Sequence, residues 1–312
     1  MGLFMINDDM DNNGAMPDNQ KETPGNTELV AQLTDLLTVT QTGEREYRGK
    51  RKIGGVGRVY GGQVIGQALA AAIDTVDEDR PVHSLHAYFL RGGSEDHEIE
   101  YRVEADFDGG SFCNRRVVAM QQGKIIFNLA ASFHKQEPGH FHQPPMPDVP
   151  EPEELENVRS LAQNNNIKID PETRAFYMRP TPIEMRPIGN PPFSSQASSE
   201  PHSAMWFRVV DTLDAQPQWM HRVIAAYASD IALIATAVRP HAPFKVQPAS
   251  LDHSVWFHQD VHTDDWLLYT IDSPWAGQAR GLGIGKIFDR EGRLVATVAQ
   301  EGLMRDLDMR RK

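Results

Sequence analysis

The segment from Gln63 to Ile73 constrains the fold more than any other part of this sequence, because it is apolar or small on nearly every side. A helix on a protein surface keeps one polar face, so a helix of this composition is expected to be buried. Its alanines and glycines allow other elements to approach closely all round. We interpret Gly61 and Gly62, which precede it, as a turn. The sequence therefore predicts a central helix enclosed by other elements.

Apolar and β-branched runs after this helix predict antiparallel strands. The pair Gln122-Gly123 stands between the last two runs and is typical of a hairpin turn. A helix at 29–37 and a strand at 46–52 are expected before the central helix. Together these elements predict an α+β unit over residues 29–136, with strands at 83–90, 99–106, 112–121 and 124–133.

The second part of the chain repeats this order. His83-Ser84 recurs as His253-Ser254, and Gly123-Lys124-Ile125 recurs as Gly292-Arg293-Leu294, about 170 positions later in both cases. The same order of elements at one spacing indicates an internal duplication. The second unit is expected over 202–306, with one long helix at 220–238 and strands at 206–210, 250–258, 266–273, 281–289 and 294–302.

Two segments lie outside these units. Residues 1–28 carry six acids and one base with little apolar content, which predicts a disordered acidic tail. Of the 21 prolines, 13 lie between Pro138 and Pro201, so residues 137–201 are predicted to be a Pro-rich linker. Within it we expect a modest helix at 153–163 and an extended piece at 182–188.

Charge and cysteine content exclude several classes of function. The net charge of −12 disfavours binding to nucleic acid. The single cysteine, Cys113, permits no internal disulfide and is expected to be a buried, inert thiol. The histidine pairs His83/His86 and His140/His142 suggest a metal only weakly, so no metal ion is expected. No membrane span or secretory signal is visible, so the expected location is the cytoplasm.

Asp230 is the most informative polar residue, because it interrupts the apolar, Ala-rich helix expected at 220–238. Burying an unpaired carboxylate costs several kcal/mol. A buried carboxylate with polar neighbours is one way to make a general base or to hold a water molecule. The alternative is that Asp230 faces a solvent slot or caps a break in the helix. The sequence alone leaves both interpretations open.

Other motifs give weaker signals. Gln300 ends an apolar strand and could orient a water through its amide, or could simply be a polar residue at a strand end. Ser250-Leu251-Asp252-His253-Ser254 contains the residue types of a catalytic triad, but alternation along a strand puts His253 on the opposite face from Asp252 and Ser254. There is no Gly-x-Ser-x-Gly motif, and the run 281–286 lacks the residues of a phosphate-binding loop, so it is expected to be a glycine-rich strand.

Five segments together resemble the acyl-CoA thioesterase II family, the TesB-like double hot-dog thioesterases. These segments spread over about residues 30–306 and are 59–69, 83–91, 227–230, 251–258 and 300–305. The resemblance implies a hot-dog fold in each unit, which is a long helix wrapped by an antiparallel sheet. It also implies hydrolysis of acyl-CoA thioesters to a fatty acid and free CoA, with no cofactor.

In this family an Asp, a Thr or Ser, and a Gln hold the attacking water. By motif these roles fall on Asp230, Ser250 and Gln300, all in the second unit; the serine stands where bacterial members commonly have threonine. The first unit is expected to lack all three groups. The CoA phosphates need cations, for which Arg115, Arg116, Arg280 and Lys286 are candidates.

Two alternative functions stay open at this point. The chain could be an acyl-CoA-binding sensor without turnover, or a hot-dog hydratase. A hydratase would show an Asp-His pair near a helix start, and the nearest histidines in sequence to Asp230 are His221 and His241. A homo-oligomer, either a dimer or a tetramer, is expected because hot-dog sheets often pair.

Overall fold

The computed structural model describes residues 23–306 except 165, 168, 192–199 and 242–245. Residues 1–22 of the tail expected at 1–28 lie outside the described residues, as do residues 307–312. The first helix, α1, spans Asn26–Leu37, so it begins inside the segment that we expected to be disordered.

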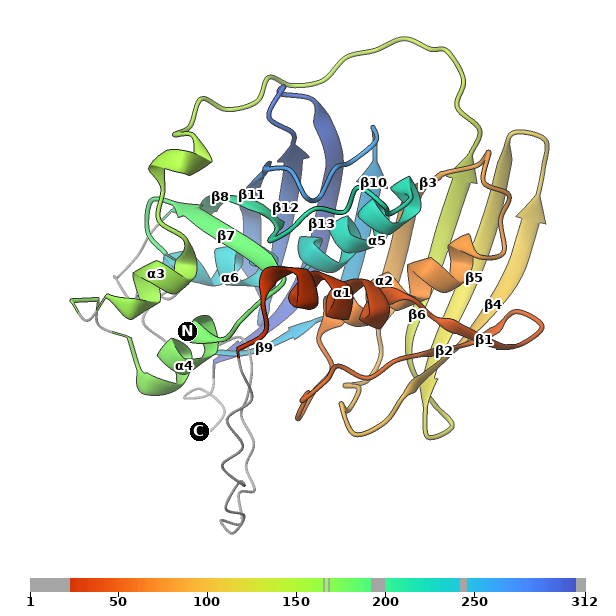
Figure 1. Cartoon of the computed structure of the whole chain (residues 1–312), viewed down its shortest axis with the longest axis horizontal. Coiled ribbons are helices and arrows are strands. Elements are labelled where there is room, and N and C mark those ends of the chain that lie inside the picture. Colours follow the sequence, from red (N-terminus) through yellow and green to blue (C-terminus); the bar gives the residue numbers. More distant parts are fainter. Residues whose placement is uncertain (1–22, 165, 168, 192–199, 242–245, 307–312) are drawn as a thin grey trace.

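One antiparallel sheet organises the described chain (Figure 1). Its strands lie in the order β1-β2-β4-β5-β6-β3-β10-β13-β12-β11-β8-β7, and β9 pairs with β13 outside this path. In the first unit the strands are β1 (Thr40–Gly43), β2 (Glu46–Gly49), β3 (Val82–Phe89), β4 (Ile99–Asp108), β5 (Phe112–Gln121) and β6 (Lys124–His134). The later strands are β7 (Ile183–Ile188), β8 (His202–Val209), β9 (Val246–Ser250), β10 (Asp252–Phe257), β11 (Leu267–Gly277), β12 (Arg280–Phe288) and β13 (Leu294–Asp306).

The strand order is mirrored about the junction of β3 and β10. Outward from this junction, β6, β5 and β4 follow on one side, and β13, β12 and β11 follow on the other. The two central strands are antiparallel, with Leu85 opposite Val255. A mirrored order is what an internal duplication predicts, because each copy contributes the same strands around a local twofold axis.

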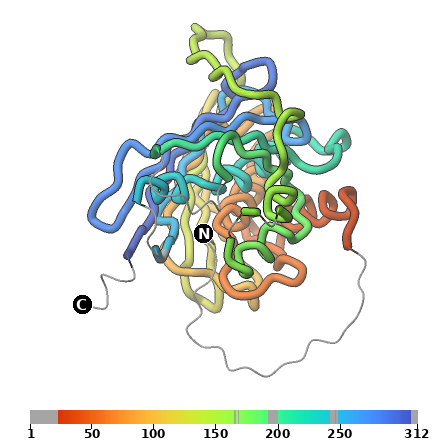
Figure 2. The backbone as a smooth tube through the Cα atoms, turned by 90° about the vertical axis from the view of Figure 1, so that its left-hand side faces the viewer, coloured from red at the N-terminus to blue at the C-terminus, as the bar shows by residue number. Residues whose placement is uncertain are grey.

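The central helices of the two units are α2 (Gly61–Ile73) and α5 (Gln218–Ser229). Both lie against the same face of the sheet (Figures 1 and 2). As expected from its composition, α2 is buried from Gly62 to Ala72. Gln67 on α2 is fully buried and its amide bonds the carbonyl oxygens of Leu36 and Lys50, so this glutamine is a structural residue of the core.

Two expectations about these helices are wrong. Gly61 and Gly62 do not form a turn but the first turn of α2. The long helix expected at 220–238 is broken after Ser229 and resumes as α6 (Leu233–Val238). Ala232 between them has φ of 71°, a left-handed conformation that no regular helix accommodates.

The strand expected at 250–258 is also divided. Ser250 ends β9, β10 begins at Asp252, and both pair with β13. The alternation expected for β10 is confirmed, because His253 is fully buried whereas Asp252 and Ser254 are partly exposed. The glycine-rich run 281–286 lies in β12, as expected.

The Pro-rich segment is more structured than a linker. After β6 the chain crosses one end of the sheet and forms η1 (Pro152–Glu154), α3 (Val158–Gln163) and α4 (Pro171–Met178) before it enters the sheet as β7 (Figure 1). We did not expect α4, although Asp170 caps its N-terminus by accepting from Thr173 N at 2.8 Å. This cap and the following proline are the local signal that we missed.

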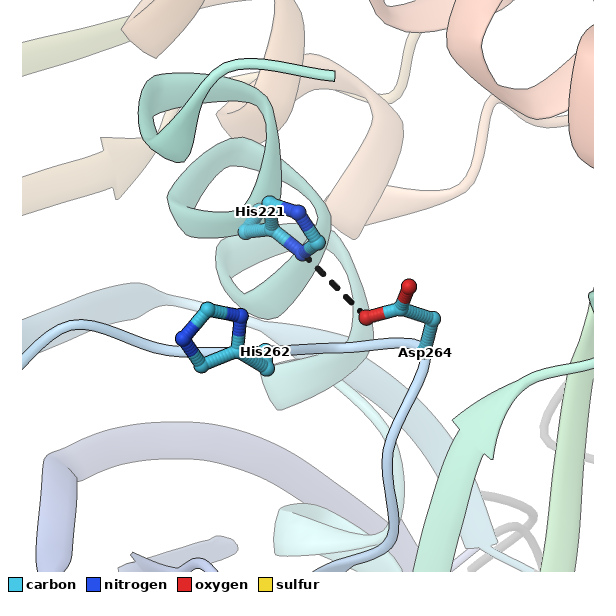
Figure 3. A group of neighbouring side chains, drawn as sticks. All are labelled: His221, His262 and Asp264. Atoms are coloured by element: carbon cyan, nitrogen blue, oxygen red, sulfur yellow. Dashed lines mark ion pairs between the residues drawn. The ribbon is translucent and has the colours of Figure 1, made fainter. Parts of the chain in front are cut away.

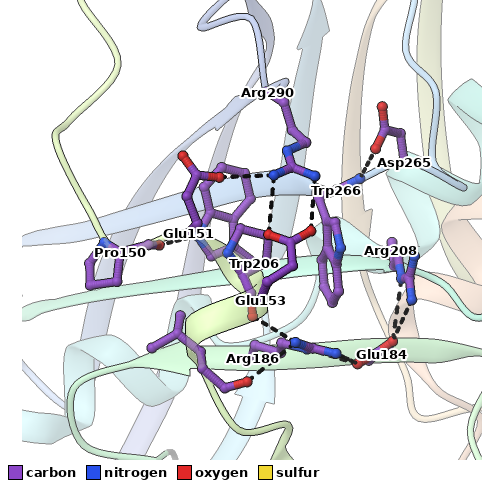
Figure 4. A network of polar contacts seen from close by, with 12 residues as sticks. Pro150, Glu151, Glu153, Glu184, Arg186, Trp206, Arg208, Asp265, Trp266 and Arg290 are labelled. Carbon is purple, nitrogen blue, oxygen red and sulfur yellow. Dashed lines mark hydrogen bonds and ion pairs between the residues drawn. The ribbon is translucent and has the colours of Figure 1, made fainter.

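Polar contacts fix this segment against the second unit (Figure 4). Trp206 donates its indole N–H to Pro150 O at 2.9 Å. Arg290 pairs with both Glu151 and Glu153. These contacts lie around a small apolar cluster centred on Trp206 and Trp266. Together the polar and apolar contacts hold this segment against the second unit.

One stretch, Gln218–His241, is long and apolar enough by composition to cross a membrane, and 61% of its most apolar window is buried inside the protein. This stretch comprises α5 and α6 together with the break at Asp230. Its burial against the sheet and α2 is what the core helix of a double hot-dog fold requires.

Candidate active site

The carboxylate of Asp230 lies where the two units meet. Asp230 caps the C-terminus of α5, and its side chain points toward the N-terminus of α2 in the other unit. The backbone N–H of Gly62 donates to Asp230 Oδ2 at 3.0 Å. The residue is 9% exposed. The sequence left open whether Asp230 is a buried, paired carboxylate or a residue that faces solvent or caps a helix break. Asp230 does cap a helix break, but its carboxylate is buried and hydrogen-bonded.

Gln300 and Ser250 complete the cluster. Gln300 on β13 is 1% exposed. Its amide Nε2 donates to Asp230 Oδ1 at 2.9 Å and to Ser250 Oγ at 2.7 Å. Ser250 ends β9, which pairs with β13 at Gly302. The structure therefore brings together all three site residues that the sequence predicted, from three separate elements.

The environment of Asp230 favours a proton acceptor that works near neutral pH. Burial raises the pKa of Asp230 from 3.8 to about 6, and hydrogen bonds from Gln300, Gly62 and Ser250 oppose this rise. A carboxylate with a pKa near 6 is a stronger base than a solvent-exposed one and is still ionised at pH 7. The arrangement can thus accept a proton from a water molecule.

Close backbone approach explains the glycines at the start of α2. A Cβ at Gly62 would lie 2.2 Å from Tyr227 O, and a Cβ at Gly61 would lie 2.7 Å from Asp230 Oδ2. Only glycine allows α2 to begin this close to the end of α5. The sequence showed this glycine pair, but we interpreted it as a turn, and its role in the site depends on a contact between segments 168 residues apart.

His253 is a further polar residue at the site that sequence reasoning placed only on a strand face. Its Nδ1 lies 3.0 Å from Gln300 Oε1, and its Nε2 lies 2.8 Å from Ser229 Oγ. The signal that could have found it is the repeated His-Ser pair, because its counterpart His83 lies on the matching strand.

A second cluster of His221, His262 and Asp264 lies at the opposite end of α5 (Figure 3). Their possible ligand atoms lie within 4.8 Å of one another beside a cavity of about 290 Å³. The Nδ1 atom of His221 faces Asp264 at 3.8 Å, but it also accepts the backbone N–H of Thr263 at 3.2 Å. A neutral imidazole nitrogen has one lone pair, so this bond competes with a metal ion for it.

Most of the cations suggested for CoA phosphates are paired within the protein. Arg115 is buried and pairs with Asp108. Arg116 pairs with Glu104 and Asp106, and Arg280 with Glu301. Lys286 has no ion pair among the described residues.

Both halves of the chain match known domains of one family. Residues 51–134 match the acyl-CoA thioesterase N-terminal domain, and residues 145–304 match the C-terminal domain. Acyl-coenzyme A thioesterase 8 of Homo sapiens is 39% identical over 91% of this chain and 92% of its own length. Acyl-CoA thioesterase 2 of Haemophilus influenzae is 34% identical over 89% of this chain and 99% of its own.

Solved structures agree with these relatives. The acyl-CoA thioesterase II TesB2 of Mycobacterium marinum superposes with a TM-score of 0.73 at 38% identity, over 88% of this chain and 98% of that one. The tesB protein of Mycobacterium avium subspecies paratuberculosis gives 0.72 at 30% identity, over 89% and 99%.

The mirrored sheet around two buried helices, with a hydrogen-bonded carboxylate where they meet, defines a double hot-dog thioester hydrolase. The chain belongs to the acyl-CoA thioesterase family, and its activity is the hydrolysis of acyl-CoA thioesters. The sensor and hydratase alternatives that the sequence left open are not favoured.

Proposed function

We propose that Asp230, Ser250 and Gln300 hold and activate the water that hydrolyses the acyl-CoA thioester. The single observation that carries this proposal is the pair of hydrogen bonds that the Gln300 Nε2 amide donates, one to Asp230 Oδ1 and one to Ser250 Oγ. Ser250 Oγ accepts from the amide, so its own proton remains available to a neighbouring acceptor. A water beside this cluster would give its proton to Asp230 and attack the thioester carbonyl carbon. Collapse of the tetrahedral intermediate would then break the C–S bond, and the leaving CoA thiolate would take the proton back from Asp230.

A backbone N–H at the start of α2 can donate a hydrogen bond to the thioester carbonyl oxygen, on which negative charge develops during attack. Within the first turn, Gly62 N–H is bound to Asp230, and the N–H groups of Gln63 and Val64 are bound to Tyr60 O. Gly61 N–H has no acceptor among the described residues, and it lies at the positive end of the helix dipole. We assign it as the donor that stabilises the tetrahedral oxyanion. No acyl-enzyme forms in this scheme.

The test compares the carboxylates that cap the C-termini of the two central helices. Asp230→Asn removes the proposed base. Asp74→Asn is the control: Asp74 caps α2 and accepts a hydrogen bond from the Tyr47 hydroxyl, whereas Asp230 accepts one from the Gln300 amide. Free thiol released from short, medium and long acyl-CoAs is measured. We expect Asp230→Asn to lose about 10²–10⁴ in kcat and Asp74→Asn to keep turnover in the folded protein. Wild-type turnover in Asp230→Asn would refute the assignment.

We also propose a homo-oligomer, either a dimer or a tetramer, located in the cytoplasm. A yeast relative at 25% identity is named a peroxisomal acyl-coenzyme A thioester hydrolase, so location varies among more distant relatives. Support for the oligomer comes from the outer sheet face. There Ile284, Ala299, Ser254 and His86 form one cross-strand row of exposed or partly exposed residues.

A further inference from the structure

We infer that His253 is a positioning residue that fixes the orientation of the Gln300 amide and thereby directs the Gln300 N–H groups to Asp230 and Ser250. This inference rests on the proposed function of those three residues. His253 is 0% exposed and does not itself reach the carboxylate. It acts through one hydrogen bond on β13, the strand beside its own.

The proton positions follow from what each partner can accept. Asp230 is a carboxylate and only accepts, so the Gln300 atom facing it must be the Nε2 donor. Gln300 Oε1 therefore faces His253 and only accepts, so His253 Nδ1 must carry a proton. The contact with Asp230 thus fixes the orientation of the amide, and that orientation fixes the tautomer of His253.

The other ring nitrogen supports the same tautomer. Burial lowers the pKa of His253 to about 4, so the ring is neutral at pH 7 and Nε2 carries no proton. Ser229 Oγ, 2.8 Å away, is placed to donate to Nε2. Ser229 Oγ also lies 2.9 Å from Ala226 O, the second acceptor for its proton. Ser229 directly precedes Asp230, so one end of α5 carries both the base and this donor.

Loss of the imidazole would free the amide to rotate. A flipped Gln300 would place Oε1 against the Asp230 carboxylate, where two acceptors repel each other. Because the hydrogen bond from Gln300 lowers the pKa of Asp230, its loss raises that pKa further. The other titratable groups that act on Asp230 are Tyr60, Tyr227 and Tyr269, and burial raises each phenol pKa, so they stay neutral.

The experiment is a double-mutant cycle of His253→Phe and Gln300→Ala, read as kcat and as the pH profile of kcat/KM. We expect His253→Phe to lower kcat by up to about 100-fold and to move the acid limb to higher pH. In the Gln300→Ala background, His253→Phe should cost nothing more, because the residue through which it acts is gone. His221→Phe, another buried imidazole on the second unit, is the control and should leave the acid limb in place.

Each contrary outcome has a separate meaning. Additive losses in the double variant, or an unmoved acid limb in an active His253→Phe, would overturn the role of His253. Full activity of Gln300→Ala would instead overturn the proposed function. If His253→Phe does not fold, Ser229→Ala removes the hydroxyl that faces Nε2, together with its contact to Ala226 O, and should shift the acid limb in the same direction by less. An unmoved limb in that variant also overturns the inference.

Discussion

At the residue scale, the site depends on a carboxylate that the fold makes costly to ionise. Asp230 is held by Gly62 and Gln300, yet burial still raises its pKa to about 6. The same burial that would strengthen Asp230 as the proposed base therefore destabilises the folded protein at neutral pH. Such a conflict between stability and activity is common at catalytic positions.

This conflict predicts how stability depends on pH. A folded pKa above the unfolded value of 3.8 gives a contribution that is fully present below about pH 4 and is lost as pH rises through about 6. We expect the free energy of unfolding of Asp230→Asn, relative to wild type, to rise by up to about 3 kcal/mol between pH 4 and pH 7. Urea unfolding of both proteins at several pH values measures this difference. A difference that is independent of pH would contradict the raised pKa.

At the scale of elements, the site is made by one helix end meeting another. The break after Ser229 ends α5 at Asp230, and the left-handed Ala232 turns the chain into α6. The glycine pair lets α2 start against this break. The distance between the two helix ends, rather than any single side chain, sets where the carboxylate lies.

Gly62→Ala tests this close approach. The added Cβ would meet Tyr227 O at 2.2 Å, so α2 must move away from Asp230. We expect a loss of stability of about 1–3 kcal/mol together with a fall in kcat. Gly110→Ala, where nothing lies within 4 Å of the new Cβ, is the control and should change neither. Thermal unfolding and thiol release measure both effects; a Gly62→Ala enzyme with unchanged kcat would show that the helix ends tolerate separation.

At the scale of the whole molecule, the two units are equivalent in topology but not in chemistry. The first unit was expected to lack all three polar groups, but its central helix is capped by Asp74, one residue beyond the segment that we considered. Asp74 accepts from Tyr47, and no glutamine among the described residues hydrogen-bonds to it. His83, the counterpart of His253, contacts the hydroxyl of Ser132 on the neighbouring strand, where His253 contacts the amide of Gln300. Only one of the two helix ends thus carries a complete cluster.

The uncovered outer face of the sheet predicts association of whole molecules. Tyr88 is 59% exposed and Ile284 is 37% exposed on strands near the centre of the sheet. Covering such a face removes apolar area from water. We expect light scattering to give a mass of at least twice 35.0 kDa at micromolar concentration. A constant mass of 35.0 kDa would contradict the oligomer.

The sequence by itself determined the buried helix α2, most strands and the duplication, because hydrophobic periodicity and turn residues act over a few positions. It predicted the buried helix, the hairpin at Gln122-Gly123 and, in each unit, a helix followed by strands along the chain, all of which the structure contains. The resemblance, not periodicity, named Asp230, Ser250 and Gln300 as a set. Only the tertiary structure decided how Gly62 and His253 act, since each hydrogen bond to the cluster joins segments far apart in the chain. Gly62 meets the cluster through packing between the two units, and His253 through pairing of strands within the second unit; local pattern encodes neither contact.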